Sequence, residues 1–170
     1  MNTVHVIHVI LADYDLERRE LVAAGLEGPD ILVHKCSDRI EALGKYWLLY
    51  AEGILPRAVV ASWLMDTPAS RSFFSAVGRE VDHTSLALFT NVGRLDPDGI
   101  LVCYTDDMPE TVTELEHSSV ADKVQVVWAE DAPHEVARLL RLDERGKTTA
   151  SKTSGNISGI RVARRSLLSR

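Results

Sequence analysis

Residues 100–105 read Ile-Leu-Val-Cys-Tyr-Thr, and Asp106-Asp107-Met108-Pro109-Glu110 follows directly. The apolar run predicts a buried strand, and the acidic pair with Pro109 indicates that a helix begins just after it. The same layout occurs near the N-terminus, where the apolar residues 4–12 precede Asp13-Tyr14-Asp15. Buried strands that lead directly into helices are typical of a parallel α/β sheet.

The rest of the chain repeats this alternation between apolar strand patterns and helical patterns. We expect strands at 4–12, 31–36, 58–65, 100–105 and 124–128, with helices between them and a last helix at 133–142. The first helix, 16–26, has its Glu and Arg residues predicted on its outer side. The sequence therefore predicts a doubly wound, flavodoxin-like α/β fold with five parallel strands and helices on both faces. An insertion is expected before the fourth strand, where the apolar residues 86–89 form either an added strand or part of an excursion.

Composition limits the class of protein. The 170 residues are 45% hydrophobic and 26% charged, which suits a single globular core. No apolar run reaches the ~18 residues that a membrane span needs. The two cysteines, Cys36 and Cys103, lie in strand patterns and suggest no disulfide framework, so we expect a cytoplasmic protein.

Charge divides the chain into two parts. Residues 143–170 have a net charge of +5, and the whole chain has −6, which leaves −11 on residues 1–142. We expect 1–142 to be the folded domain and 143–170 to be a basic, disordered tail or linker, because its polar composition buries too little surface to order it. An acidic domain argues against direct nucleic-acid binding by residues 1–142.

Polar side chains follow three of the predicted strands, at 13–15, 62–66 and 105–107. In a parallel sheet these carboxyl ends meet at one edge, which is where ligands bind in such folds. Carboxylates facing a hydroxyl there are suited to a hard cation such as Mg²⁺. Asp15 is as well explained by capping the helix that follows it as by metal binding. There is no glycine-rich phosphate loop or dinucleotide fingerprint.

The residues VIHVILADYDLERRELV (6–22), PRAVVASWLMD (56–66) and the stretch that begins ILVCYTDDMPE (100–110) resemble successive parts of a response-regulator receiver domain. The resemblance covers about residues 3–142. It implies two-component signalling, in which an aspartate accepts a phosphoryl group beside a Mg²⁺ ion held by an acidic pair. A Thr or Ser and a Lys then read the phosphoryl charge.

Carried over position by position, the match is incomplete. Asp13 falls on the first acid of the pair, Tyr14 falls on the second and Asp15 follows it. Ser62 falls on the phosphoacceptor, with Asp66 as a displaced alternative. Thr105 matches the switch hydroxyl, and Trp128 replaces the lysine. The resemblance thus implies a degenerate receiver with no metal, or one held only by Asp13 and Asp15.

Three hypotheses follow for function. The first is a pseudo-receiver that is not an enzyme, needs no cofactor and signals through protein contacts made by residues 109–142. A homodimer through the same face is one form of such a contact. The second is an active phosphoacceptor that uses Asp66 with Mg²⁺. The third is a small-molecule-binding domain on a flavodoxin-like scaffold, because a fold alone does not define function.

Overall fold

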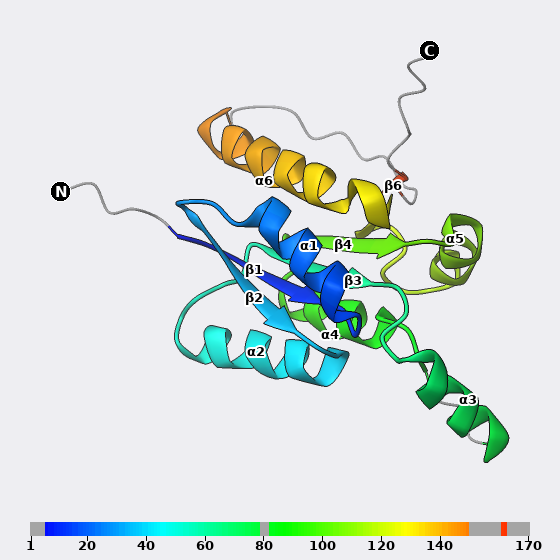
Figure 1. Ribbon diagram of the computed structural model, residues 1–170. Coiled ribbons are helices and arrows are strands. Elements are labelled where there is room, and N and C mark those ends of the chain that lie inside the picture. The colour runs from blue at the N-terminus through cyan, green and yellow to red at the C-terminus, as the bar shows by residue number, and fades with distance from the viewer. Residues whose placement is uncertain (1–5, 79–81, 150–160, 163–170) are drawn as a thin grey trace, which may run out of the picture.

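The computed structural model describes residues 6–78, 82–149 and 161–162, and within them one parallel sheet forms the centre of the molecule (Figure 1). The strand order is β2-β1-β3-β4-β5-β6. The strands are β1 (Ile7–Ala12), β2 (Ile31–Cys36), β3 (Ala58–Ser62), β4 (Ile100–Thr105), β5 (Val124–Trp128) and β6 (Arg161–Val162). The order 2-1-3-4-5 confirms the predicted five-stranded, flavodoxin-like sheet.

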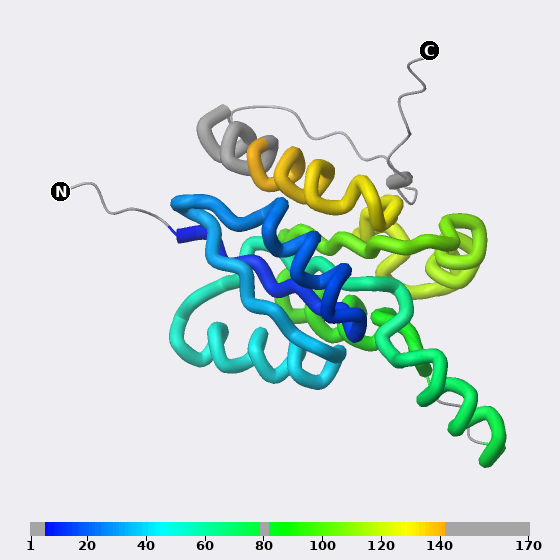
Figure 2. Tube along the Cα trace, viewed as in Figure 1, coloured from blue at the N-terminus to red at the C-terminus, as the bar shows by residue number. Residues whose placement is uncertain are grey.

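Helices cover both faces of this sheet (Figure 2). One face packs against α1 (Leu16–Leu26) and α6 (Ala132–Thr149), and the other against α2 (Arg39–Ala51), α4 (Leu86–Leu95) and α5 (Met108–Glu116). Side-chain caps fix several helix starts: Asp15 begins α1, Asp38 begins α2 and Asp107 begins α5. These caps satisfy backbone N–H groups that the first helical turn leaves without partners.

The structure corrects the position of the insertion before the fourth strand. Residues 86–89 are neither a strand nor part of an excursion, because they begin α4, which buries Leu88, Phe89 and Val92 against the sheet. This spacing is helical, but a run of four apolar residues is too short to separate helix from strand. The inserted element is instead α3 (Pro68–Ala76), which starts at the cap Thr67 and projects from the body (Figure 1).

The insertion leaves the body through two short antiparallel stretches, 63–65 and 83–85, which we refer to as the neck. Leu64 and Thr84 form an isolated antiparallel bridge. Met65 donates its N–H to the carbonyl of His83 at 2.8 Å, and Ser85 donates to the carbonyl of Trp63 at 2.9 Å. The predicted strand 58–65 therefore ends earlier, at Ser62, because its last residues pair with the returning chain.

The C-terminal part also differs from the prediction. Helix α6 continues to Thr149, beyond the expected end at residue 142, so the first residues of the predicted disordered tail are helical. Arg161 and Val162 pair in parallel with Gln125 and Val126 at the edge of the sheet. The rest of the predicted tail lies outside the described residues. Among the described helices, none combines the length and apolar character that crossing a bilayer requires.

Candidate functional site

The carboxyl ends of β1, β3 and β4 meet around the side chain of Arg18. Arg18 lies in the first turn of α1, three residues after the cap Asp15. Its guanidinium contacts Asp13 after β1 through Nε (2.6 Å to Oδ2) and Nη2 (2.9 Å to Oδ1). Nη2 also donates to Ser62 Oγ at 3.1 Å, and Nη1 to Asp106 Oδ2 at 3.0 Å. One cation therefore bridges three strand ends.

Asp13 is fully buried, and its carboxylate is saturated with donors. Besides the two contacts from Arg18, Oδ1 accepts the N–H of Asp15 at 2.9 Å and Oδ2 accepts the hydroxyl of Tyr104 at 2.6 Å. Hydrogen bonds to a charged acceptor are short and strong, and a buried charge needs them. The four donors occupy both oxygens of the Asp13 side chain.

The pKa shifts of its two side-chain partners agree with this geometry. The hydrogen bond to Asp13 is the largest influence on Arg18 and raises the pKa of its guanidinium, although partial burial acts in the opposite direction. Burial raises the pKa of Tyr104, and the negative charge of Asp13 raises it further. Both groups are therefore held in the protonated form that donates to Asp13.

Arg18 was missed by the sequence analysis, which placed the Arg residues of this helix on its outer side. Its side chain is 22% exposed and turns across the helix start toward Asp13. The available signal was the spacing: an Arg in the first helical turn, five residues after an Asp at a strand end, lies at the same sheet edge. Helical periodicity alone does not reveal this, because the partner lies on the preceding strand.

The two candidate carboxylates besides Asp13 have other partners. Asp15 caps α1 through a 3.0 Å contact from the N–H of Arg18. Asp66 Oδ2 lies 2.7 Å from His83 Nδ1, within hydrogen-bond distance, which ties Asp66 to the neck of the insertion. Ser62, in contrast, is 4% exposed at the end of β3 and contacts Arg18. The structure thus brings Asp13, Ser62 and Asp106 together around one guanidinium, while Asp15 and Asp66 are engaged elsewhere.

Thr105 and Trp128 lie opposite each other in the β4–β5 register. The Thr105 hydroxyl accepts from Thr111 Oγ1 at 2.8 Å and from the N–H of Asp107 at 3.0 Å, so it is bound to the start of α5. Trp128 is partly buried and packs against the core beneath α2, α4 and α5. Both residues therefore stabilise the β4–α5 edge of the crevice.

The residues at this crevice do not fit a Mg²⁺ ion. Mg²⁺ needs free carboxylate oxygens in near-octahedral geometry, but both oxygens of Asp13 are taken and a guanidinium lies against them. The described part of the chain contains no group of three His, Cys, Asp or Glu side chains suited to a metal. Both cysteines are buried free thiols.

Solved structures of other proteins share the fold of this chain. No family model and no curated protein matches the chain. Among solved structures, the signal receiver domain of an HD-domain protein from Pseudomonas fluorescens matches with a TM-score of 0.58 and 12% identity, over 85% of this chain and 99% of that one. A CheY-like receiver domain from Methanospirillum hungatei matches at 0.55 and 16% identity, over 84% and 98%.

The Salmonella typhimurium response regulator RcsB also matches, with a TM-score of 0.55 and 13% identity over 89% of this chain. The match spans 64% of the RcsB chain, whose structure is described in terms of DNA interaction. At such low identity these likenesses establish the fold alone. The chain therefore has the fold of response-regulator receiver domains.

Proposed function

We propose that this chain is a degenerate receiver domain that signals through protein contacts without phosphorylation of an aspartate. The main support is Arg18, whose guanidinium contacts Asp13, Ser62 and Asp106 at the crevice. In an active receiver this place belongs to a phosphoryl group and its metal ion. Here a tethered cation, the guanidinium of Arg18, lies against Asp13, and the hydrogen bond to Asp13 raises the pKa of this guanidinium.

The chemistry of Ser62 supports the same conclusion. A hydroxyl forms a phosphate ester, whereas a carboxylate forms the acyl phosphate whose high transfer potential drives the ordinary switch. Ser62 is also buried and already accepts a hydrogen bond from Arg18. Phosphoryl transfer depends on positioned metal ions that neutralise charge, and the donor set at this crevice does not fit one. We therefore propose a non-enzymatic role without Mg²⁺. The two free thiols support a location in the cytoplasm.

The surface proposed for partner binding is formed by α5, β5 and the first part of α6, residues 109–142. Its acidic side chains include Glu114, Glu116, Asp122, Glu130 and Asp131. Like-charged side chains on one surface attract a basic partner and raise the rate of association. A partner with a basic docking surface fits this face, whether it is a different protein or a basic segment of a second copy.

Phosphoryl transfer gives the direct test. The protein and its Asp66→Asn variant are each incubated with acetyl phosphate and Mg²⁺, and the intact mass of both is measured. We expect neither protein to gain a phosphoryl group. A gain in the wild type that disappears in Asp66→Asn would establish the active-receiver alternative and overturn the proposal.

Metal binding is tested separately by intrinsic tryptophan fluorescence during a Mg²⁺ titration. Trp63 directly follows Ser62 and is buried, so it reports on the end of β3. We expect the spectrum to remain constant, because Arg18 holds the only carboxylate that is buried at this edge among the described residues. A saturable change in fluorescence would contradict the proposal that Arg18 takes the place of a metal ion.

A further inference from the structure

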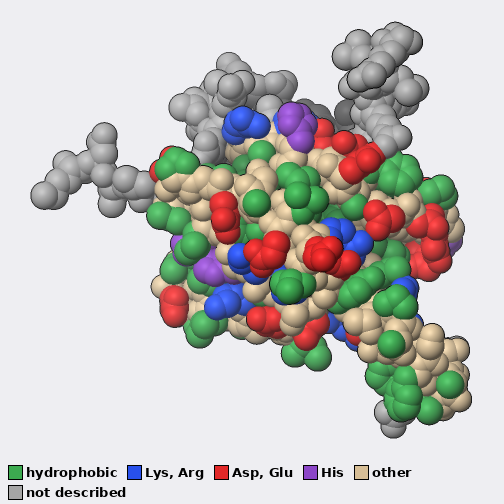
Figure 3. Space-filling view, viewed as in Figure 1, with side chains coloured by type: hydrophobic (Ala, Val, Ile, Leu, Met, Phe, Trp, Pro, Cys, Tyr) green, Lys and Arg blue, Asp and Glu red, His purple; other side chains and the backbone are tan. Residues whose placement is uncertain are grey.

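The projecting helix α3 exposes an apolar stripe to solvent. Ala69, Phe73, Ala76 and Val77 recur at the spacing of one helix face, and all four are exposed. Phe73 is 63% exposed and Val77 is 52% exposed. The helix buries none of its own residues, and Figure 3 shows hydrophobic side chains gathered on this projection. Exposed apolar stripes of this kind mark interaction surfaces.

The side of α3 that borders this stripe faces the neck. The ring of Phe74 lies 5.8 Å from the ring of His83, and His83 contacts Asp66. The ring of Phe73 packs edge-on against Phe74, with 5.7 Å between the ring centroids, and stays exposed. The exposure of Phe73 is therefore set by the architecture of the insertion.

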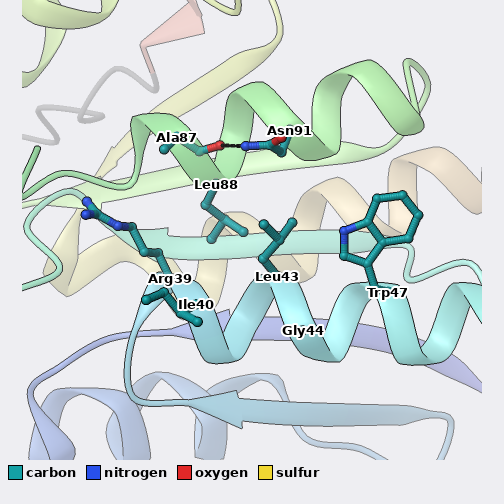
Figure 4. A pocket seen from close by; sticks show the side chains of 8 residues that line it. All are labelled: Arg39, Ile40, Leu43, Gly44, Trp47, Ala87, Leu88 and Asn91. Atoms are coloured by element: carbon teal, nitrogen blue, oxygen red, sulfur yellow. Dashed lines mark hydrogen bonds between the residues drawn. The ribbon is translucent and has the colours of Figure 1, made fainter.

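An apolar groove lies between α2 and α4 on the same molecule (Figure 4). Its volume is about 380 Å³, and it is lined mainly by Ile40, Leu43, Trp47, Ala87 and Leu88. Ile40 is 77% exposed and Trp47 is 46% exposed. Gly44 is an exposed lining residue of the groove on α2, and an added Cβ there would meet nothing within 4 Å. The groove is thus open and uncovered by any described part of the chain.

We propose that the apolar stripe of α3 docks in the α2–α4 groove of a second copy of this chain, and that the second copy returns the same contact. The two surfaces match in length. Nine helical residues are about 13 Å long, and the groove wall from Ile40 to Trp47 is about 10 Å long. Phe73 is the side chain that enters the groove, and the alanines let the helix approach closely.

The stripe and the groove are both connected to the neck, which favours a dimer in which each copy makes the same contact with the other. Arg39, at the groove end of α2, donates to the backbone carbonyls of Asp82 and Thr84 in the returning chain. Helix α4 begins at Leu86, directly after the neck. Because both surfaces start from the neck, a twofold axis beside it places each stripe at the other copy's groove. Twofold dimers of this kind are the commonest closed assemblies.

The area also favours two contacts over one. A single α3 in a single groove buries on the order of 700 Å², counting both surfaces, which is below the ~1,000 Å² of a specific interface. Two reciprocal contacts bury on the order of 1,400 Å², within the usual range. A lone apolar peptide in the groove would therefore bind weakly, whereas a second copy of the chain reaches a stable interface.

Sedimentation velocity over a concentration series tests the proposal. We expect a monomer–dimer equilibrium for the wild type. Phe73→Asp should weaken the dimer at least tenfold, and Gly44→Phe, which adds a bulky ring to the groove lining, should do the same. Both sites are open to solvent, so the monomers remain folded, as circular dichroism will verify. Leu21→Asp, an equally drastic change at an exposed position of α1, should leave the dimer intact.

Cysteine pairing separates exchange between copies from folding back within one copy. A tagged chain with Phe73→Cys is mixed with an untagged chain with Gly44→Cys, and we expect a disulfide between the two. The native thiols do not interfere, because both are buried.

Three outcomes overturn the proposal: a monomer at every concentration, a dimer insensitive to both Phe73→Asp and Gly44→Phe, or no disulfide between the tagged Phe73→Cys chain and the untagged Gly44→Cys chain. A dimer lost on Glu114→Lys and retained in Phe73→Asp would place the interface on α5 instead. None of these outcomes depends on the phosphorylation assay.

Discussion

Arg18 and Asp13 form a two-pronged ion pair, with Nε 2.6 Å from Oδ2 and Nη2 2.9 Å from Oδ1. The guanidinium is planar and presents two parallel donors, which match the two oxygens of a carboxylate. Asp13 is fully buried, whereas Arg18 is 22% exposed. The pair therefore places a fixed positive charge at the mouth of the crevice and a fixed negative charge beneath it.

The Arg18→Met variant tests the importance of this pair for stability. Removing one partner leaves a buried carboxylate without its countercharge, which typically costs about 3–5 kcal/mol. We expect the free energy of unfolding, measured by urea denaturation, to fall by about 3 kcal/mol, the lower end of this range, because Arg18 is partly exposed. Arg18→Lys should recover part of the loss. Lys35→Met, which breaks the exposed pair with Glu20, is the control and should have little effect.

Tyr104 makes stability sensitive to alkaline pH. Burial and the charge of Asp13 raise the pKa of its phenol above the ordinary 10.0. In the unfolded chain this phenol ionises near pH 10, while in the folded protein it stays protonated, so unfolding releases a proton and stability falls as pH rises above 10. Tyr104→Phe should show a weaker decline, although it is less stable at neutral pH by about 1.5–3 kcal/mol because Asp13 loses a hydrogen bond.

Thermal denaturation of wild type and Tyr104→Phe between pH 8 and 11 measures this difference. Burial also raises the pKa of Tyr46, to about 12, so some decline remains in the variant. Parallel curves for the two proteins would show that Tyr104 does not contribute.

His34 makes stability sensitive to acid. Burial is the largest cause that lowers its pKa from 6.5, and the positive charges of His8 and Lys45 lower it further. His8 Nδ1 and His34 Nε2 lie 2.9 Å apart, which places the two rings in direct contact. The unfolded chain binds a proton at His34 more readily than the folded chain, and stability therefore falls as pH drops through about 6.5.

The His34→Asn variant should flatten this dependence between pH 7 and pH 5, as measured by urea denaturation at each pH. His117→Asn is a matched control, because His117 is an exposed residue at the end of α5. An equal flattening in both variants would mean that the histidine pair is not the cause.

Alanine substitutions at two helical glycines should change the free energy of unfolding in opposite directions. A Cβ at Gly25 of α1 would collide with the ring of Pro133 at the start of α6, whereas a Cβ at Gly44 of α2 meets nothing. Gly25→Ala should reduce the free energy of unfolding by about 1–3 kcal/mol, because α1 and α6 must move apart. Gly44→Ala should increase it by about 0.5–1 kcal/mol, since alanine loses less backbone entropy in a helix. Urea denaturation of both variants under identical conditions checks the contrast.

Local patterns were sufficient for most of the fold. The apolar runs at 31–36, 100–105 and 124–128 coincide with β2, β4 and β5. The insertion was misplaced because residues 86–89 offered too few positions to show a helical period. The extra length of the chain before β4 was recognised, but only the packing of α4 on the sheet shows that α3 is the added helix.

The candidate site was only partly predictable. The convergence of Asp13, Ser62 and residues 105–107 follows from the parallel topology, which places strand ends at one edge. Whether Asp15 capped a helix or faced the crevice remained open until its contact with the N–H of Arg18 was known. Asp66 was a candidate because it lies near a strand end, and the pairing of the neck explains why its partner is His83.

The sequence by itself determined the order of strands and helices, and that a hydroxyl, that of Ser62, lies near the end of the third strand, because apolar period and residue identity are local properties. Only the tertiary structure decided which cation neutralises Asp13. Its partners Arg18 and Tyr104 are 5 and 91 residues away, and their contacts form only when β1, β4 and α1 pack together. A buried charge selects its partner by distance in space, which the spacing of residues along the chain does not specify.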